Sequence, residues 1–130
     1  MSASRTGPEH TNGKVVLIVD DDRDIAESIA DVLRARGRRV VVALDGQGAL
    51  DAAHGHAVAL VLLDWRLPDA MAGATLVRRL RESCGPSVPV VVLSADPMSL
   101  AEAREAQVND YLPKPFEVGD LLDLVDNLTD

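Results

Sequence analysis

Acidic, hydroxyl and amine side chains stand at the ends of four short apolar stretches in this sequence. Three consecutive aspartates occupy positions 20–22, and Asp64, Ser94 and Lys114 follow later stretches. Two carboxylates about 4 Å apart repel by about 4 kcal/mol at an effective dielectric constant of ~20, so grouped aspartates favour a bound cation. Mg²⁺ suits such a group, because it prefers oxygen ligands and keeps waters that a phosphate can replace.

The same side chains fit phosphoryl chemistry. A carboxylate held beside Mg²⁺ can attack phosphorus and form an acyl phosphate. The hydroxyl of Ser94 and the ammonium of Lys114 could then donate to the phosphoryl oxygens. Taken singly, both are ordinary loop residues, and Asp22 also suits the N-cap of a following helix. The functional interpretation therefore depends on whether the fold brings these positions together.

The apolar stretches predict a parallel β-sheet. Continuous runs of β-branched and aliphatic residues are typical of parallel strands that are buried on both faces. Such runs cover residues 15–19, 40–43, 60–63 and 90–93, with a shorter one at 110–112. Helices are expected between them, over residues 25–33, 47–54, 76–80, 100–107 and 121–128. We expect Asp22 to begin the first helix and Gly37 to end it.

This alternation of strands and helices predicts a doubly wound α/β fold, with a central parallel sheet and helices on both faces. In such folds, ligands bind beyond the carboxyl ends of the strands. The aspartates at 20–22, Asp64, Ser94 and Lys114 all fall at that edge of the sheet, and the opposite edge has no comparable set. We therefore expect the candidate site there.

The composition describes one acidic domain. A chain of 130 residues, 47% of them hydrophobic, suffices for one core, which must be aliphatic because only 2% of the residues are aromatic. The formal net charge of -8 repels nucleic acid and anionic lipid, so direct nucleic-acid binding is not expected. Cys84 is the single cysteine, which excludes an internal disulfide.

The organisation of the chain is simple. Residues 1–13 are rich in Ser, Thr, Gly and Asn without apolar periodicity, so we interpret them as a flexible N-terminal segment before one domain at 14–130. No apolar signal segment or membrane-spanning run occurs in the sequence. We therefore expect a cytoplasmic protein that does not contact membranes.

Four blocks of the sequence, at residues 15–22, 63–69, 92–95 and 110–116, resemble the receiver domains of bacterial two-component response regulators. The single-domain chemotaxis response protein is a familiar member of that family. The resemblance covers nearly all of the chain from residue 14 to its end. It implies a flavodoxin-like fold of five β-α units, with the strands of the parallel sheet in the order 2-1-3-4-5.

The resemblance also implies roles for individual residues. Asp64 would accept the phosphoryl group. Asp21 would bind Mg²⁺ directly, Asp20 would help through its charge or a water, and the backbone carbonyl of Arg66 would supply another ligand. Two side chains at the mouth of this site, Arg66 and Asp96, have opposite charges. We hypothesise that they approach each other and partly shield the phosphate; the alternative is two solvated loop charges.

Further implied roles concern the phosphoryl group and the switch. Ser94 and Lys114 would hold the phosphoryl oxygens, and the Lys114–Pro115 peptide is expected to be cis, which proline permits. Tyr111 stands at the switch aromatic position, and it should turn inward as Ser94 moves toward the phosphate. Trp65 directly follows the acceptor, so its indole should report on metal and phosphate binding.

The implied function is a switch in two-component signal transduction. A histidine kinase or a histidine phosphotransfer protein would phosphorylate Asp64 in a Mg²⁺-dependent reaction, and altered protein contacts would carry the output. The receiver would catalyse only its own phosphorylation and dephosphorylation. Its further partner would be a downstream protein or an output domain. Phosphorylation would also allow two copies of the receiver to form a homodimer. Both a stand-alone regulator and a receiver from a larger protein are consistent with the sequence.

Two other functions compete with this interpretation. An interaction module that is never phosphorylated would not need the complete set of Asp21, Asp64, Ser94 and Lys114. A small phosphate-ester hydrolase with the same aspartyl chemistry usually has an additional acid or a cap domain, for which this chain has no room.

The sequence departs from the usual family pattern in three places. Ser94 replaces the commoner threonine, which preserves the hydroxyl. The loop at residues 70–73 is about one residue longer than usual. The stretch from Ser94 to Lys114 is about two residues shorter, with Gln107 and Val108 where Gly-Ala is usual. That stretch belongs to the face that commonly carries output or dimer contacts, which puts the usual dimer contact in question.

Overall fold

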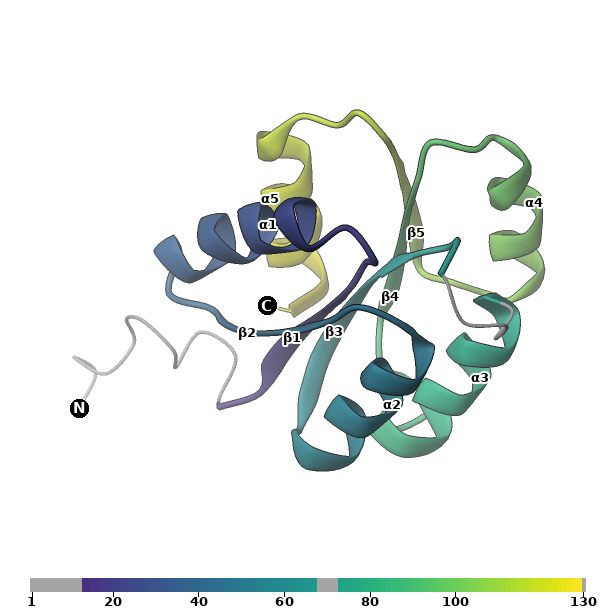
Figure 1. Cartoon of the computed structure of the whole chain (residues 1–130), viewed down its shortest axis with the longest axis horizontal. Helices are drawn as coiled ribbons and strands as arrows, with labels where there is room; N and C mark the ends of the chain where they lie inside the picture. The colour runs from purple at the N-terminus through teal and green to yellow at the C-terminus, as the bar shows by residue number, and fades with distance from the viewer. Residues whose placement is uncertain (1–12, 68–72, 130) are drawn as a thin grey trace.

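The central element of the fold is a five-stranded parallel sheet with the strand order β2-β1-β3-β4-β5 (Figure 1). This computed structural model describes residues 13–67 and 73–129. The strands are β1 (Val15–Val19), β2 (Arg39–Ala43), β3 (Val58–Asp64), β4 (Val90–Ser94) and β5 (Asp110–Pro113). Every neighbouring pair is parallel. The structure thus confirms the predicted fold class and strand order.

Helices cover both faces of this sheet. Figure 1 shows α1 and α5 together on one face, and α2 and α3 on the other with α4 beside α3. The helices are α1 (Arg23–Ala35), α2 (Gly46–Gly55), α3 (Gly73–Cys84), α4 (Met98–Glu105) and α5 (Val118–Thr129). Helices α1 to α4 each connect two consecutive strands, as the crossover connections of a parallel sheet require, and α5 follows β5.

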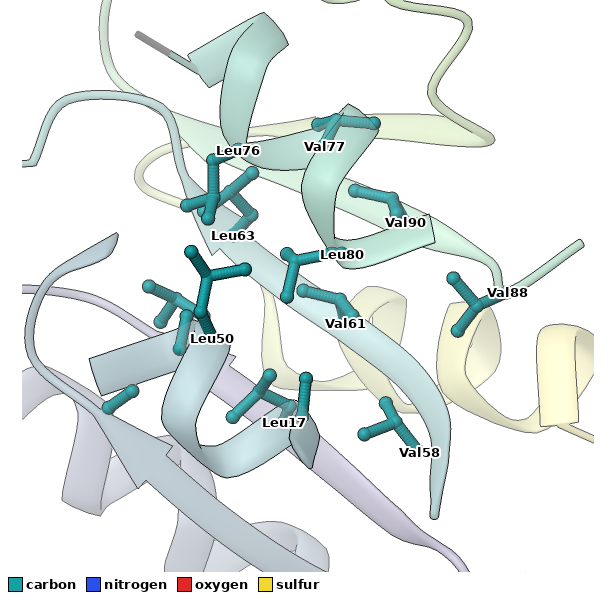
Figure 2. Packing of buried hydrophobic residues seen from close by; sticks show 14 of the residues in the cluster. Leu17, Leu50, Val58, Val61, Leu63, Leu76, Val77, Leu80, Val88 and Val90 are labelled. Atoms are coloured by element: carbon teal, nitrogen blue, oxygen red, sulfur yellow. The ribbon is translucent and has the colours of Figure 1, made fainter. Parts of the chain in front are cut away.

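The core consists of two aliphatic layers, one on each face of the sheet. Side chains alternate along a strand, so Leu17 points into the layer under α2 and α3 while its neighbour Ile18 points into the layer under α1 and α5. In Figure 2, Leu17 and Leu63 of the sheet lie among Leu50 of α2 and Leu80 of α3. These layers hold the carboxyl ends of the strands rigidly in register.

Burial differs between central and edge strands. All residues of β1 and β4 are buried, as their apolar runs predict. The same expectation is wrong for β2, where Arg39 is exposed and residues 40–42 are only half-buried. The strand lies at the edge of the sheet, so it has a neighbouring strand on one side only.

The helix boundaries follow local chemistry. The Asp22 carboxylate accepts a hydrogen bond from the Ile25 amide at 3.1 Å, which confirms the predicted N-cap of α1. Gly37, with φ of 83°, follows the end of that helix as expected. The fourth helix begins and ends two residues earlier than predicted. Its end follows from Gln107, which adopts a left-handed φ of 60° that helical backbone cannot continue through.

Two predictions concern residues beyond those that the structure describes. The flexible segment at 1–13 lies outside the described residues except for Gly13, and the longer loop at 70–73 lies outside them except for Gly73. Among the helices in the described ranges, none combines the length and the apolar character that a membrane crossing needs.

Candidate functional site

The candidate site lies at the carboxyl edge of the sheet, where four strands end. Pairing aligns Val19 with Leu63, and Ser94 with Pro113, so residues that follow these positions converge. Asp20 follows β1, Asp64 ends β3, Ser94 ends β4 and Lys114 follows β5. The predicted residues are therefore neighbours through the strand order, and no single segment of sequence could have assembled them.

Three carboxylates form the base of this site. One oxygen each of Asp20, Asp21 and Asp64 lies within 4.8 Å of the other two. Asp20 is buried, Asp64 is half-buried and Asp21 is exposed. Asp20 is held in place because its Oδ1 accepts the Asp22 amide hydrogen at 2.9 Å. The cluster thus combines a buried, hydrogen-bonded carboxylate, Asp20, with an exposed one, Asp21.

Lys114 partly compensates the negative charge. Its Nζ donates to Asp20 Oδ2 at 3.0 Å and lies 3.9 Å from Asp64 Oδ2. A carboxylate as buried as Asp20 requires such a partner, because an uncompensated charge in the interior is strongly destabilising. The Lys114 amide also donates to the Ser94 carbonyl at 2.9 Å, and the Lys114–Pro115 peptide is cis, as predicted.

The environment of Asp64 opposes its ionisation. Burial raises the pKa of Asp64 from 3.8 to about 6; the nearby Asp20 charge and a hydrogen bond with that carboxyl also raise it, while the Lys114 charge and the Arg66 amide lower it. One ammonium shared among three carboxylates therefore leaves the negative charge undercompensated. A cation at this cluster would favour the ionised, nucleophilic form of Asp64.

Ser94 is buried, and its hydroxyl is engaged by the start of α4. Its Oγ accepts the Asp96 amide hydrogen at 3.1 Å and donates to Ser99 Oγ at 3.1 Å. Sequence reasoning identified Ser94 but missed Ser99. A serine five residues further along, across a loop and the first turn of a helix, carries no pattern that would have identified it.

Tyr111 lies half-buried in the edge strand β5. Its hydroxyl donates to the Asp96 carbonyl at 3.0 Å, and it lies 3.4 Å from the Ser94 carbonyl. Tyr111 therefore contacts the same loop that holds the Ser94 hydroxyl. The inward turn expected of this ring concerns a second state, and it remains a prediction.

Arg66 and Asp96 form an ion pair at the mouth of the site, in agreement with the expected approach. The Arg66 side chain is 74% exposed and that of Asp96 is 24% exposed. The pair links the loop after β3 to the loop after β4. The expected approach of the two side chains is thus confirmed, while the shielding of a phosphate stays a prediction.

Trp65 connects the end of β3 to α4. Its indole Nε1 donates to Glu102 Oε1 at 2.6 Å, and the ring is buried. The ring also packs over Gly73, where an added Cβ would lie 2.6 Å from ring carbons, so only glycine fits there. Sequence reasoning assigned Trp65 a reporter role but no partner, because the pairing depends on where α4 lies.

Residues 16–126 match the family model of the response regulator receiver domain. The chain therefore belongs to this family, as the sequence blocks at the strand ends predicted. Among its relatives is the transcriptional regulatory protein KdpE of Mycobacterium tuberculosis, which is 38% identical over 110 residues. The match covers 83% of this chain and 47% of KdpE, so the chain spans about half the length of that relative.

Solved structures agree with this assignment. The chemotaxis protein CheY4 of Vibrio cholerae superposes with a TM-score of 0.80 at 27% identity, covering 88% of this chain and 98% of CheY4. The receiver domain of the sensor histidine kinase PA1611 of Pseudomonas aeruginosa superposes with a TM-score of 0.78 at 30% identity, covering 90% and 98%. The PA1611 structure has a magnesium ion coordinated in its active-site cleft.

Proposed function

We propose that this receiver domain is a phosphorylation-dependent switch in which Asp64 accepts a phosphoryl group. The observation that carries the proposal is the cluster of Asp20, Asp21 and Asp64 with Lys114 beside it. Such a cluster has the parts of a phosphoryl-transfer site: a nucleophilic carboxylate, oxygen ligands for a cation, and an ammonium for the transferred group.

The donor set fits Mg²⁺. Asp21 and Asp64 would bind the ion through carboxylate oxygens, with the backbone carbonyl of Arg66 as a further ligand and Asp20 acting through its charge or a water. These are hard oxygen donors, and the undercompensated charge at Asp64 supports the need for a cation. When bound, Mg²⁺ neutralises the carboxylates and draws electron density from the phosphoryl oxygens.

In the proposed reaction, a carboxylate oxygen of Asp64 attacks the phosphorus of a phosphohistidine on a kinase or phosphotransfer protein. The new oxygen–phosphorus bond forms as the bond between phosphorus and the imidazole nitrogen breaks, and the imidazole keeps the electron pair. Lys114 and Ser94 then donate to the phosphoryl oxygens. The receiver contributes positioning and charge compensation, and it promotes only its own phosphorylation and dephosphorylation.

The output of the switch would be a shift between two conformations. Phosphoryl contacts to Ser94 and Lys114 stabilise one arrangement of the faces of α4 and α5, and Tyr111 follows the loop after Ser94. A partner that binds this arrangement better reads the signal. That partner would be a separate downstream protein, an output domain, or a second copy of the receiver.

The test is phosphorylation with a small donor. We expect incubation with Mg²⁺ and acetyl phosphate to add one phosphoryl group to the intact mass, with acetate as the leaving group. EDTA or the Asp64→Asn substitution should abolish the gain, and the mutant also controls for modification elsewhere. If neither protein gains mass and Trp65 fluorescence does not respond to Mg²⁺, the domain acts as an interaction module that is never phosphorylated.

A further inference from the structure

The hydroxyl of Ser94 points to a second serine that the phosphorylation chemistry does not use. We propose that Ser99 is a positioning residue, whose hydroxyl pairs with Ser94 in the unphosphorylated protein and must release it when Asp64 is phosphorylated. This inference rests on the proposed function, and it adds that Ser99 competes with the phosphoryl group for the Ser94 hydroxyl. The pair is buried on both sides, with Ser94 3% and Ser99 2% exposed.

The Ser94 hydroxyl cannot donate to Ser99 and to a phosphoryl oxygen at the same time. A serine hydroxyl has one proton to donate. The Ser94 hydroxyl accepts from the Asp96 amide and donates to Ser99 Oγ, both at 3.1 Å. To donate to a phosphoryl oxygen, Ser94 must withdraw its proton from Ser99. Phosphorylation thus exchanges a neutral buried hydrogen bond for a stronger one to a charged acceptor.

The position of Ser99 connects this exchange to α4. Ser99 lies in the first turn of that helix, and its amide donates to the Asp96 carbonyl at 3.0 Å. Pro97, the N-cap residue, supplies no side-chain hydrogen bond to this turn. The Ser94 contact therefore joins the first turn of α4 directly to the end of β4, and the Trp65–Glu102 hydrogen bond joins the helix to the residue after β3 one turn later.

Removing the Ser99 hydroxyl should make the receiver more responsive. In Ser99→Ala, the Ser94 proton loses its buried acceptor in the unphosphorylated protein, which destabilises that state relative to the phosphorylated one. The loss of one buried neutral hydrogen bond corresponds to about a three- to tenfold change in an equilibrium constant. We expect the midpoint for beryllofluoride, a stable mimic of the phosphoryl group, to fall by that factor in the presence of Mg²⁺.

The experiment is a beryllofluoride titration followed by ¹⁹F NMR of the bound mimic. Ser28→Ala removes an exposed serine hydroxyl of α1 and should leave the midpoint unchanged. In the Ser94→Ala background, the Ser99→Ala substitution should have no effect on the midpoint, because the hydroxyl for which Ser99 competes is gone. Urea unfolding of each variant checks that the mutant proteins are folded.

Three results would overturn the inference. An unchanged or higher midpoint in Ser99→Ala means that Ser99 does not compete for Ser94. An equal decrease with and without Ser94 means that the mutation acts by loosening α4 in general. If the wild-type protein itself fails to bind beryllofluoride, the proposed function fails, and the competition at Ser94 fails with it.

Discussion

Arg66 is a cation that lies beside the carboxylate cluster and yet does not neutralise it. The Arg66 guanidinium pairs with Asp96. The Asp64 carboxylate pairs with Lys114, and its hydrogen bond from Arg66 comes from the backbone amide. The charge of Arg66 therefore compensates Asp96 at the mouth of the site and does not compensate the carboxylate cluster. An ion pair in that position can restrict the approach of water to a phosphoryl group on Asp64.

Arg66→Ala and Asp96→Ala should each accelerate loss of the phosphoryl group. Exposed ion pairs are weak, so the expected increase in the dephosphorylation rate is about two- to fivefold. The double mutant should be little faster than either single mutant, because both changes open the same pair. The measurement is the decay of phosphorylated protein, followed by intact mass after removal of acetyl phosphate. Arg79→Ala, an exposed arginine on α3, is the control, and unchanged rates in both single mutants would refute the shielding role.

At the scale of the elements, the short fourth helix is the least conventional part of the fold. It ends at Glu105, and Gln107 two residues later has the left-handed φ that glycine usually adopts. The guanidinium of Arg81 on α3 donates to the Gln107 carbonyl at 3.0 Å and to Asn109 Oδ1 at 3.0 Å. These bonds hold the strained turn and fix the end of α4 against α3.

Gln107→Gly should therefore stabilise the protein. A left-handed conformation costs a residue with a side chain about 1–2 kcal/mol, and the greater freedom of glycine in the unfolded chain offsets part of the gain. The expected net increase in the free energy of unfolding is about 0.5–1 kcal/mol. Gln107→Ala keeps the Cβ and serves as the control in urea unfolding. A gain from alanine as large as that from glycine would show that backbone strain is not the cause.

The elements also show what the sequence could predict. Apolar runs such as 90–93 and the Asp22 cap depend on neighbouring residues, so the strands, the first helix boundary and the edge that carries Asp64 were all predictable. The partial exposure of β2 follows from its place at the edge of the sheet, which the apolar run at 40–43 does not show by itself. The Trp65–Glu102 and Ser94–Ser99 contacts depend on where α4 lies against the sheet. Distances of that kind are set by three-dimensional packing, which a single sequence does not reveal.

For the whole molecule, the fold maintains a concentration of negative charge that works against its own stability. Strand order forces Asp20, Asp21 and Asp64 together at one edge, in a chain whose formal net charge is already -8. Lys114 compensates only part of this charge. The rigid aliphatic layers on both faces of the sheet must offset the repulsion, and a cation that binds the cluster should relieve it.

The stability of the metal-free protein should accordingly depend on pH through Asp64. The folded protein keeps the Asp64 proton up to a pKa of about 6, whereas the unfolded chain releases it near 3.8. Between these values the folded state binds more protons, so the contribution of this group to the free energy of unfolding falls as pH rises. Asp64→Asn removes the cost of ionisation and should be more stable than wild type by about 3 kcal/mol above pH ~7, with the difference vanishing below pH ~4.

Urea unfolding of both proteins in EDTA, at one-unit steps from pH 4 to 8, measures this difference. Other titrating groups are common to the two proteins, so subtracting the two curves isolates residue 64 together with its interactions with Asp20 and Lys114. Repeating the series with Mg²⁺ is the control, because an ion bound at the cluster stabilises the ionised carboxylate and should reduce the advantage of asparagine. If the difference in the free energy of unfolding stays constant across the pH range in EDTA, the proton linkage is contradicted. If that difference is the same with and without Mg²⁺, the result argues against metal binding at Asp64.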